Sequence, residues 1–336
     1  MKLIVFVVLL LHYALGALWA QHDLNIERHV CYGQGDNGQD LYMIVVEKKD
    51  GRDFKPACIA IHGGAWSGGE AEGFMGQSEY MARQGFKVFN IDYRLLPTRM
   101  SGQVADCRTA VRHVRANAKH YGINPNRIIA MGHSAGGHLA CMLAVLRPGV
   151  WEGRGWNDVG SQIQGVVNLC GPEELVKYYA PDSEFTSLFE ALADDPKGDP
   201  VKELEKMSPI TYVRKGMCPI LSIHGGRDFI VPAIQGTDFH RELDRLGVRN
   251  KLVILPEEDH GLGKHVEDTL KLVEQFSKDF MDNKGLFAPA VPAKWLGAAD
   301  CITPPQDLRG RSAPSPALYI FGPSCYNKVD RIILPA

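Results

Sequence analysis

The chain has 336 residues, of which 45% are hydrophobic and 23% are charged, an ordinary composition for a globular protein. Lys and Arg number 37 against 39 Asp and Glu, which gives a formal net charge of −2. No strongly basic segment is present, so the sequence does not predict a nucleic-acid-binding protein. The length suffices for one large α/β domain, and a second folded domain is not required.

The first twenty residues predict a secretory signal peptide. Lys2 precedes an apolar run over residues 3–11, and small residues follow as far as Ala20. A positive start, a short apolar run and a small-residue exit are typical of such a signal. The run ends at His12 and is short for a membrane span, so an uncleaved anchor is the weaker alternative. Cleavage after Gly16 or Ala20 predicts a secreted or periplasmic protein without stable membrane insertion.

After this segment, short apolar runs alternate with helix-favouring segments. The runs predict strands at 58–61, 87–91, 128–131, 164–169, 219–223 and 251–255. The intervening segments predict helices at about 74–83, 104–114, 139–144, 234–246 and 266–280. Because several strands are continuous apolar runs, we predict an α/β fold with a mostly parallel central sheet and helices on both faces.

The α/β domain is predicted to occupy residues 21–287. Residues 171–207 depart from the alternation and carry four aromatic residues, Tyr178, Tyr179, Phe185 and Phe189. We therefore predict that they form a short cap-like insertion over one end of the sheet. From Ala288 the chain is rich in proline, so residues 288–336 are predicted to form a tail outside the α/β core.

Eight cysteines in a chain with a signal peptide raise the question of disulfides. Cys58, Cys141 and Cys170 lie inside apolar runs, which predicts small buried thiols. Cys301 and Cys325 flank a Pro-rich stretch and could close a loop. The spacing leaves the connectivity open.

Four polar stretches each follow a predicted strand, namely His62–Trp66, Gly132–Gly136, Gly225–Asp228 and Glu257–Gly261. In a parallel sheet, ligands bind at the carboxyl ends of the strands, so these stretches are expected to meet at one edge. They supply a serine, an acid and a histidine in that order, with the serine in a G-x-S-x-G turn between a strand and a helix. This order is the α/β-hydrolase arrangement.

We predict that Ser134 is the catalytic nucleophile, that His260 is its base and that Asp228 orients His260. A serine hydroxyl is a weak nucleophile until a neighbouring base takes its proton. The carboxylate holds the imidazole in the productive tautomer. Asp259 lies beside His260 in the sequence, but adjacent side chains on a loop usually diverge. His265 is expected to begin the last helix.

The oxyanion that forms during acyl transfer requires preorganised donors. We predict that the backbone N–H groups of Gly63, Gly64 and Ala135 form this oxyanion hole. His138 is expected to pack in the core or to line the pocket. No group of His and Cys has convincing zinc spacing, so neither a metal ion nor a cofactor is expected.

These stretches resemble the hormone-sensitive-lipase-like carboxylesterases of the α/β-hydrolase superfamily over roughly residues 44–280. The residues that carry the resemblance are His62–Trp66, Asp92–Leu95, Gly132–Gly137, Ser208–Ile210, Gly226–Asp228 and Asp259–Gly261. The resemblance implies an α/β-hydrolase fold and ester hydrolysis through an acyl-enzyme. It is greatest with secreted bacterial esterases that remove acetyl or feruloyl groups from plant polysaccharides, which implies small-molecule or polysaccharide-linked ester substrates. Ala65 departs from the family, which often has a third glycine there.

Three other functions stay open. The H-G-G-x-W loop also occurs in arylformamidases and prenylcysteine methylesterases, so an arylformamidase-like amidase is one alternative. A serine peptidase of the prolyl-oligopeptidase type is another, although the large N-terminal propeller that such peptidases share is missing. The third is an inactive hydrolase-fold binding protein, but such proteins typically lose a member of the triad.

Overall fold

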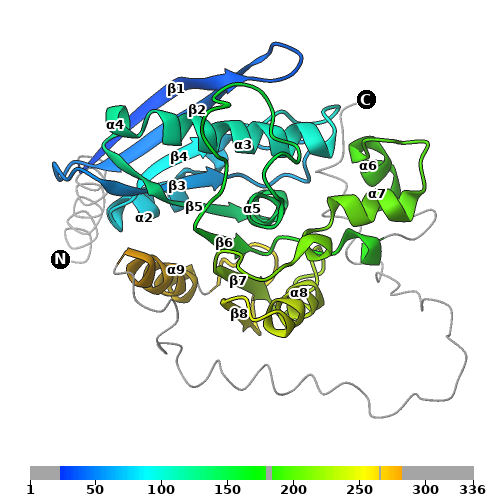
Figure 1. Cartoon of the computed structure of the whole chain (residues 1–336). Helices are drawn as coiled ribbons and strands as arrows, with labels where there is room; N and C mark the ends of the chain where they lie inside the picture. Colours follow the sequence, from blue (N-terminus) through cyan, green and yellow to red (C-terminus); the bar gives the residue numbers. More distant parts are fainter. Residues whose placement is uncertain (1–22, 179–183, 265, 282–336) are drawn as a thin grey trace, which may run out of the picture. The chain divides into compact units, whose positions relative to one another are not determined.

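An eight-stranded sheet runs through the residues that the computed structural model describes, which are 23–178, 184–264 and 266–281 (Figure 1). Its strands are β1 (Leu24–Gln34), β2 (Asp40–Lys48), β3 (Lys55–Ile61), β4 (Lys87–Ile91), β5 (Ile123–His133), β6 (Gly165–Leu169), β7 (Ile220–Gly225) and β8 (Asn250–Leu255). Their order is β1-β2-β4-β3-β5-β6-β7-β8. All pairs from β4 to β8 are parallel, whereas β2 pairs antiparallel with both β1 and β4. The predicted mostly parallel sheet is confirmed.

Helices pack on both faces of this sheet. The α-helices of the described residues are α2 (Met75–Arg83), α3 (Met100–Ala116), α4 (Ala118–Tyr121), α5 (Ala135–Val145), α6 (Glu184–Leu192), α7 (Pro200–Met207), α8 (Ile234–Arg245) and α9 (Val266–Met281). One apolar cluster joins α3, α5 and α8 to the sheet, and a second joins α2 and α9 to the opposite face. Neighbours on β3 divide between them, since Ile59 belongs to the first cluster and Cys58 to the second. The sheet core is therefore buried on both sides.

The antiparallel pair β1 and β2 is absent from the sequence prediction. β1 lies at the edge of the sheet, and most of its residues are exposed or half-buried. Its register with β2 shifts between Glu27 and Val30 and again between Cys31 and Gly33. These irregularities break the period of two, so β1 has neither the apolar run of a central strand nor the clean alternation of a half-buried one.

The segment from 171 to 207 leaves the sheet after β6 and returns to it at β7. Within its described residues it forms the 3₁₀ helix η2 (Leu175–Tyr178) and the helices α6 and α7, which lie together away from the strands (Figure 1). The Arg99 guanidinium donates to the backbone oxygens of Glu190, Ala191 and Ala193 at 3.0–3.2 Å. A cation at a helix C-terminus is favourable, so Arg99 ties the end of α6 to the start of α3.

Several predictions concern residues outside those described: the signal peptide, the proline-rich tail, Tyr179, His265, and the loop between Cys301 and Cys325. They stay predictions. The three thiols expected to be buried are confirmed as such, because Cys58, Cys141 and Cys170 are each 0% exposed. Across the described part of the chain, no helix has both the length and the apolar character of a membrane span.

Candidate active site

Ser134 lies in the turn between β5 and α5. Its backbone adopts φ 55° and ψ −123°, a strained conformation for a residue with a side chain. The Ser134 N–H donates to the Leu169 carbonyl at 2.8 Å, and the His138 N–H donates to the Ser134 carbonyl at 3.0 Å. A Cβ atom on Gly132 or Gly136 would overlap backbone atoms. Glycine is therefore required on both sides of the serine for the strand to turn this sharply into the helix.

Asp228 and His260 meet at the carboxyl ends of β7 and β8. The Oδ2 atom of Asp228 lies 2.7 Å from Nδ1 of His260. Its Oδ1 atom accepts the backbone N–H groups of Ile230 and Val231 at 2.9 and 2.8 Å. Asp228 is buried, whereas His260 is partly accessible. Because Nδ1 is bound to the carboxylate, Nε2 is the ring nitrogen that remains for proton exchange with a hydroxyl.

His133 connects the serine turn to the His260 loop. Its Nε2 atom lies 2.7 Å from the His260 carbonyl, and the two imidazole rings are 4.9 Å apart. Within the described residues, no hydrogen bond joins the Ser134 hydroxyl to the His260 imidazole. The two residues lie at the same edge of the sheet. Catalytic hydrogen bonds are often long or open without substrate, so we expect this hydrogen bond to form when substrate binds.

Gly63 packs directly against the serine. A Cβ atom at Gly63 would lie 2.9 Å from the His133 carbonyl oxygen and 3.2 Å from Cβ of Ser134. Gly64 has φ +123°, which favours glycine. Among the described residues, the N–H groups of Gly63, Gly64 and Ala135 make no hydrogen bond. Three unengaged donors near the hydroxyl are what an oxyanion hole requires.

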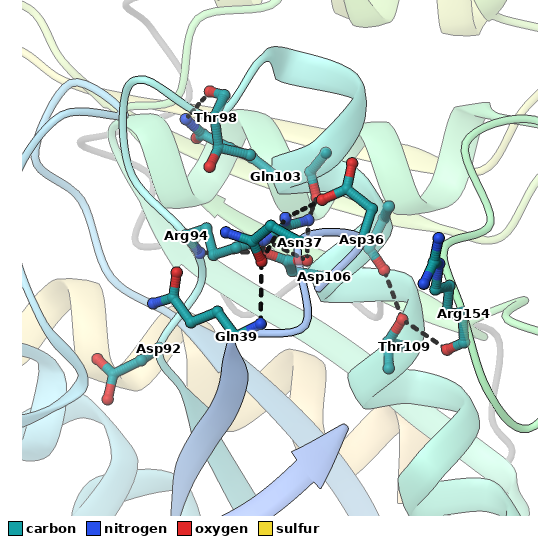
Figure 2. Close-up of polar contacts among 12 residues, drawn as sticks. Asp36, Asn37, Gln39, Asp92, Arg94, Thr98, Gln103, Asp106, Thr109 and Arg154 are labelled. Carbon is teal, nitrogen blue, oxygen red and sulfur yellow. Dashed lines mark hydrogen bonds and ion pairs between the residues drawn. The ribbon is translucent and has the colours of Figure 1, made fainter. Parts of the chain in front are cut away.

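Trp66 lies in the loop of residues 62–70 that carries these glycines, and it is fixed at both its main chain and its ring. Its carbonyl accepts the Leu96 N–H and the Gln103 amide, each at 3.0 Å. Its indole Nε1–H donates to Nδ1 of His138 at 3.3 Å. The Gln103 amide also donates to the Thr98 carbonyl, as Figure 2 shows. Sequence reasoning missed Gln103, for which no local motif gives a signal.

A buried ion pair stabilises the segment that holds Trp66 (Figure 2). The Arg94 guanidinium donates to the Asp106 carboxylate, with Nε 2.9 Å from Oδ2 and Nη2 2.8 Å from Oδ1. Arg94 also pairs with Asp36 in the turn between β1 and β2. Burial raises the pKa of the Asp106 carboxyl, and the Arg94 guanidinium opposes that shift. Arg94 thus links the β1–β2 turn, the β4–α3 loop and α3, a structural role behind the loop that carries Gly63 and Gly64.

An aromatic group from the insertion lies beside Trp66. The Phe189 ring is 6.3 Å from the Trp66 ring and 6.1 Å from the Phe185 ring. Tyr178 lies 5.6 Å from Phe185 and 6.3 Å from Phe189. Burial raises the pKa of the Tyr178 hydroxyl, so Tyr178 is neutral at physiological pH. The insertion therefore packs a buried ring, that of Phe189, against Trp66, with Phe185 and Tyr178 beside it.

Two further features lie outside the serine turn, a group of possible metal ligands and a cavity. Ligand atoms of His133, Cys170 and His260 lie within 4.8 Å of one another, which makes these residues a candidate metal group. Ligand atoms around one zinc ion lie roughly 3.3–3.8 Å apart, because zinc–ligand bonds are about 2.0–2.3 Å long. His260 already uses its Nδ1 atom on Asp228.

A cavity of about 630 Å³, lined in part by Arg127 and Arg249, opens at the amino ends of the parallel strands, the edge opposite Ser134.

Comparisons with known proteins agree with this fold. Residues 40–243 match the family model BD-FAE. The chain is similar to the probable isoprenylcysteine alpha-carbonyl methylesterase of Oryza sativa subsp. japonica, with 29% identity over a 288-residue alignment that covers 77% of this chain and 66% of that protein. The chain spans between about half and two thirds of the length of the first curated relatives it matches.

Two solved structures are similar along most of their length. A truncated form of a carbohydrate esterase from gut microbiota aligns with a TM-score of 0.68 and 26% identity, over 77% of this chain and 96% of that chain. Thermogutta terrifontis esterase 2 phosphoramylated by tabun aligns with a TM-score of 0.64 and 26% identity, over 80% of this chain and 97% of that chain.

Proposed function

The chain belongs to the BD-FAE family of α/β-hydrolases, and from this premise we propose that it is a serine carboxylesterase that acts through an acyl-enzyme intermediate. The observation that carries the proposal is the 2.7 Å contact between His260 and Asp228 at the sheet edge that also holds the strained Ser134 turn. The names of the relative and of the two solved structures, all esterases, support it.

In the first half of the reaction, the Ser134 hydroxyl attacks the ester carbonyl carbon while Nε2 of His260 takes the hydroxyl proton. Asp228 keeps the second ring nitrogen protonated and stabilises the imidazolium that forms. When the tetrahedral intermediate collapses, the bond to the alcohol breaks and the alcohol leaves with the proton from His260. Ser134 then carries the acyl group as an ester.

The negative charge of the tetrahedral intermediate falls on the former carbonyl oxygen. The N–H groups of Gly63, Gly64 and Ala135 stabilise it, and each such donor contributes roughly a factor of 10²–10³ to kcat. In the second half, His260 activates a water molecule that attacks the acyl carbon. The acid is released and Ser134 regains its proton. No cofactor or metal ion takes part in these steps.

We propose acetyl or feruloyl esters of plant polysaccharides as the substrates. The similarity to a gut carbohydrate esterase supports the carbohydrate side. The partly exposed ring of Phe185 supports an aromatic acyl group, because a flat apolar face stacks favourably on such a group.

A substrate panel tests the function. We expect turnover of p-nitrophenyl acetate, methyl ferulate and acetylated xylan, with at least 10-fold lower kcat/KM on N-acetyl-alanine p-nitroanilide and on N-formylkynurenine. The Ser134→Ala variant is the control for each substrate. Preference for the anilide would assign a peptidase, and preference for the formamide would assign an amidase. Binding of xylan without turnover of any ester would assign a binding protein.

We also propose export with removal of the N-terminal segment, on the basis of Lys2, the apolar run and the small residues before Ala20. The measurement is N-terminal sequencing of the protein recovered outside the cytoplasm of a producing cell. A start after Gly16 or Ala20 is expected. A chain that still begins at Met1 would contradict the proposal.

A further inference from the structure

His138 is a buried imidazole that the proposed reaction does not use. It lies on α5, four residues after Ser134, and is 0% exposed. Its Nδ1 atom accepts the indole N–H of Trp66 at 3.3 Å, and its Nε2 atom lies 2.7 Å from the carbonyl oxygen of Met207. An indole nitrogen only donates and a carbonyl oxygen only accepts, so Nδ1 carries the lone pair and Nε2 carries the proton. Burial lowers the pKa of His138 to about 4, which keeps the ring neutral at neutral pH.

The two partners of this ring belong to different parts of the site. Trp66 lies in the loop of residues 62–70 that carries Gly63 and Gly64 (the oxyanion loop), and Met207 is the last residue of α7 in the insertion. The insertion also packs on Trp66 directly, through the Phe189 ring at 6.3 Å. His138 itself is fixed on the helix that begins at the nucleophile. One ring therefore joins the oxyanion loop, the insertion and the nucleophile helix.

The oxyanion loop needs such an anchor because its backbone is strained. Ala65 and Trp66 both have positive φ values, 50° and 58°, which residues with side chains rarely adopt. A strained segment persists only where the surrounding contacts hold it. If the Trp66 ring is released, the backbone of residues 63–66 can relax and the two glycine N–H groups move away from the oxyanion position.

We propose that His138 is a positioning residue that couples the insertion to the oxyanion hole. Through Nδ1 it holds Trp66, and with it the N–H groups of Gly63 and Gly64. Through Nε2 it holds the end of α7. The effect on catalysis rests on the proposed esterase function, whereas the two mechanical links do not.

Two substitutions separate the two links. The side-chain oxygen of asparagine can take the place of the Nδ1 acceptor, so His138→Asn keeps the bond from Trp66 and loses the bond to Met207. The amide nitrogen of glutamine can take the place of the Nε2 donor, so His138→Gln keeps the bond to Met207 and loses the bond from Trp66. The matched control is His240→Gln on α8, which removes another buried imidazole that contacts Asn250.

Kinetics with p-nitrophenyl acetate test the catalytic consequence. We expect kcat of His138→Gln to fall about 10- to 100-fold with little change in KM, because the loss of aligned oxyanion donors acts in the transition state. We expect kcat of His138→Asn to stay within about 3-fold of the wild type. Affinity for a trifluoromethyl ketone, which forms an oxyanion on Ser134, should fall in parallel with kcat. The His240→Gln control should keep the wild-type kcat.

Hydrogen exchange measured by mass spectrometry tests the two links without any substrate. His138→Gln should raise exchange in residues 62–68 and leave residues 200–207 near wild type, and His138→Asn should do the reverse. The same exchange pattern and the same kcat in both variants would overturn the proposal. A wild-type protein that hydrolyses no ester would refute the esterase function alone, because the exchange pattern would still decide whether His138 couples the two segments.

Discussion

The Asp228 carboxylate holds the His260 ring with one oxygen and the start of the next loop with the other. Oδ2 lies 2.7 Å from Nδ1 of His260, and Oδ1 accepts the N–H groups of Ile230 and Val231. The acid is therefore fixed by the backbone before it orients the imidazole. Its orientation does not depend on the histidine.

This double role makes Asp228→Asn a specific test. In the variant, the two backbone donors hold the amide oxygen, so the amide NH₂ faces His260. Nδ1 must then accept a hydrogen bond, which moves the ring proton to Nε2, and Nε2 can no longer take the proton of Ser134. We expect kcat to fall by roughly 10³–10⁴ with the fold retained. Asp259→Asn is the control, since Asp259 is exposed and its carboxylate accepts the N–H of Gly261 at 2.9 Å; a comparable loss in both variants would contradict the assignment.

Gly63→Ala should impair catalysis more than stability. The new methyl group would lie 3.2 Å from Cβ of Ser134 and 2.9 Å from the His133 carbonyl, so the oxyanion loop must shift away from the serine. We expect kcat to fall about 100-fold, the effect of losing one oxyanion donor. Gly76→Ala on α2 is the matched control, because its methyl group would meet nothing within 4 Å and alanine favours a helix. Wild-type kcat in Gly63→Ala would show that this loop is not the oxyanion hole.

The Arg94–Asp106 pair should stabilise the fold strongly. Its side chains are 5% and 2% exposed, and loss of one partner leaves the other charge buried. We expect Arg94→Met to lower the free energy of unfolding by about 3–5 kcal/mol, measured by urea denaturation. The double change with Asp106→Leu should recover much of this loss.

The surface pair Arg245–Glu242 provides the comparison for this prediction. These side chains are 65% and 28% exposed, so Arg245→Met should change the free energy of unfolding by less than about 1 kcal/mol. Equal effects of Arg94→Met and Arg245→Met would contradict a structural role for the buried pair.

Stability should decrease in mild acid because three histidines are buried in the neutral form. Burial lowers the pKa of His113, His138 and His240 to about 4, against about 6.5 in the unfolded chain. Between these values the unfolded state binds protons that the folded state does not, so stability is lost as pH falls from 6.5 towards 4. Each histidine contributes about 2 kcal/mol of loss between pH 7 and pH 5. His240→Gln should therefore reduce the loss of unfolding free energy between pH 7 and pH 5 by about 2 kcal/mol, measured by urea denaturation at the two pH values. An unchanged pH dependence would refute the burial of neutral His240 as a cause of this loss.

The central strands could be predicted from the sequence because burial on both faces makes them continuous apolar runs. The residues of β3, for example, are all buried, and its prediction needed only Cys58 to Ile61. β1 and β2, which form a hairpin, were both missed. β1 lies at the edge of the sheet and most of its residues are exposed or half-buried, whereas the apolar run of β2 is a signal that the prediction overlooked. The irregular register of β1 removes the local signal as well.

The site likewise contains residues that the sequence predicted and contacts that it did not. Ser134, Asp228 and His260 lie directly after strands, so topology alone brings them to one edge, and their sequence motifs mark them. The residues that hold the oxyanion loop in place belong to no such motif. Gln103 contacts Trp66 across 37 positions of sequence, and the partner of His138 on α7 is a main-chain carbonyl, which any residue type supplies. Only the folded arrangement reveals these contacts.

The most direct test of the account is covalent labelling with paraoxon, followed by peptide mass spectrometry. An activated serine should displace p-nitrophenolate once per molecule, and the resulting diethylphosphoryl group should map to Ser134. The label should be lost in Ser134→Ala and strongly slowed in Asp228→Asn. A diethylphosphoryl group on any other serine, or full ester turnover by a protein completely labelled at Ser134, would contradict the claim that Ser134 is the nucleophile.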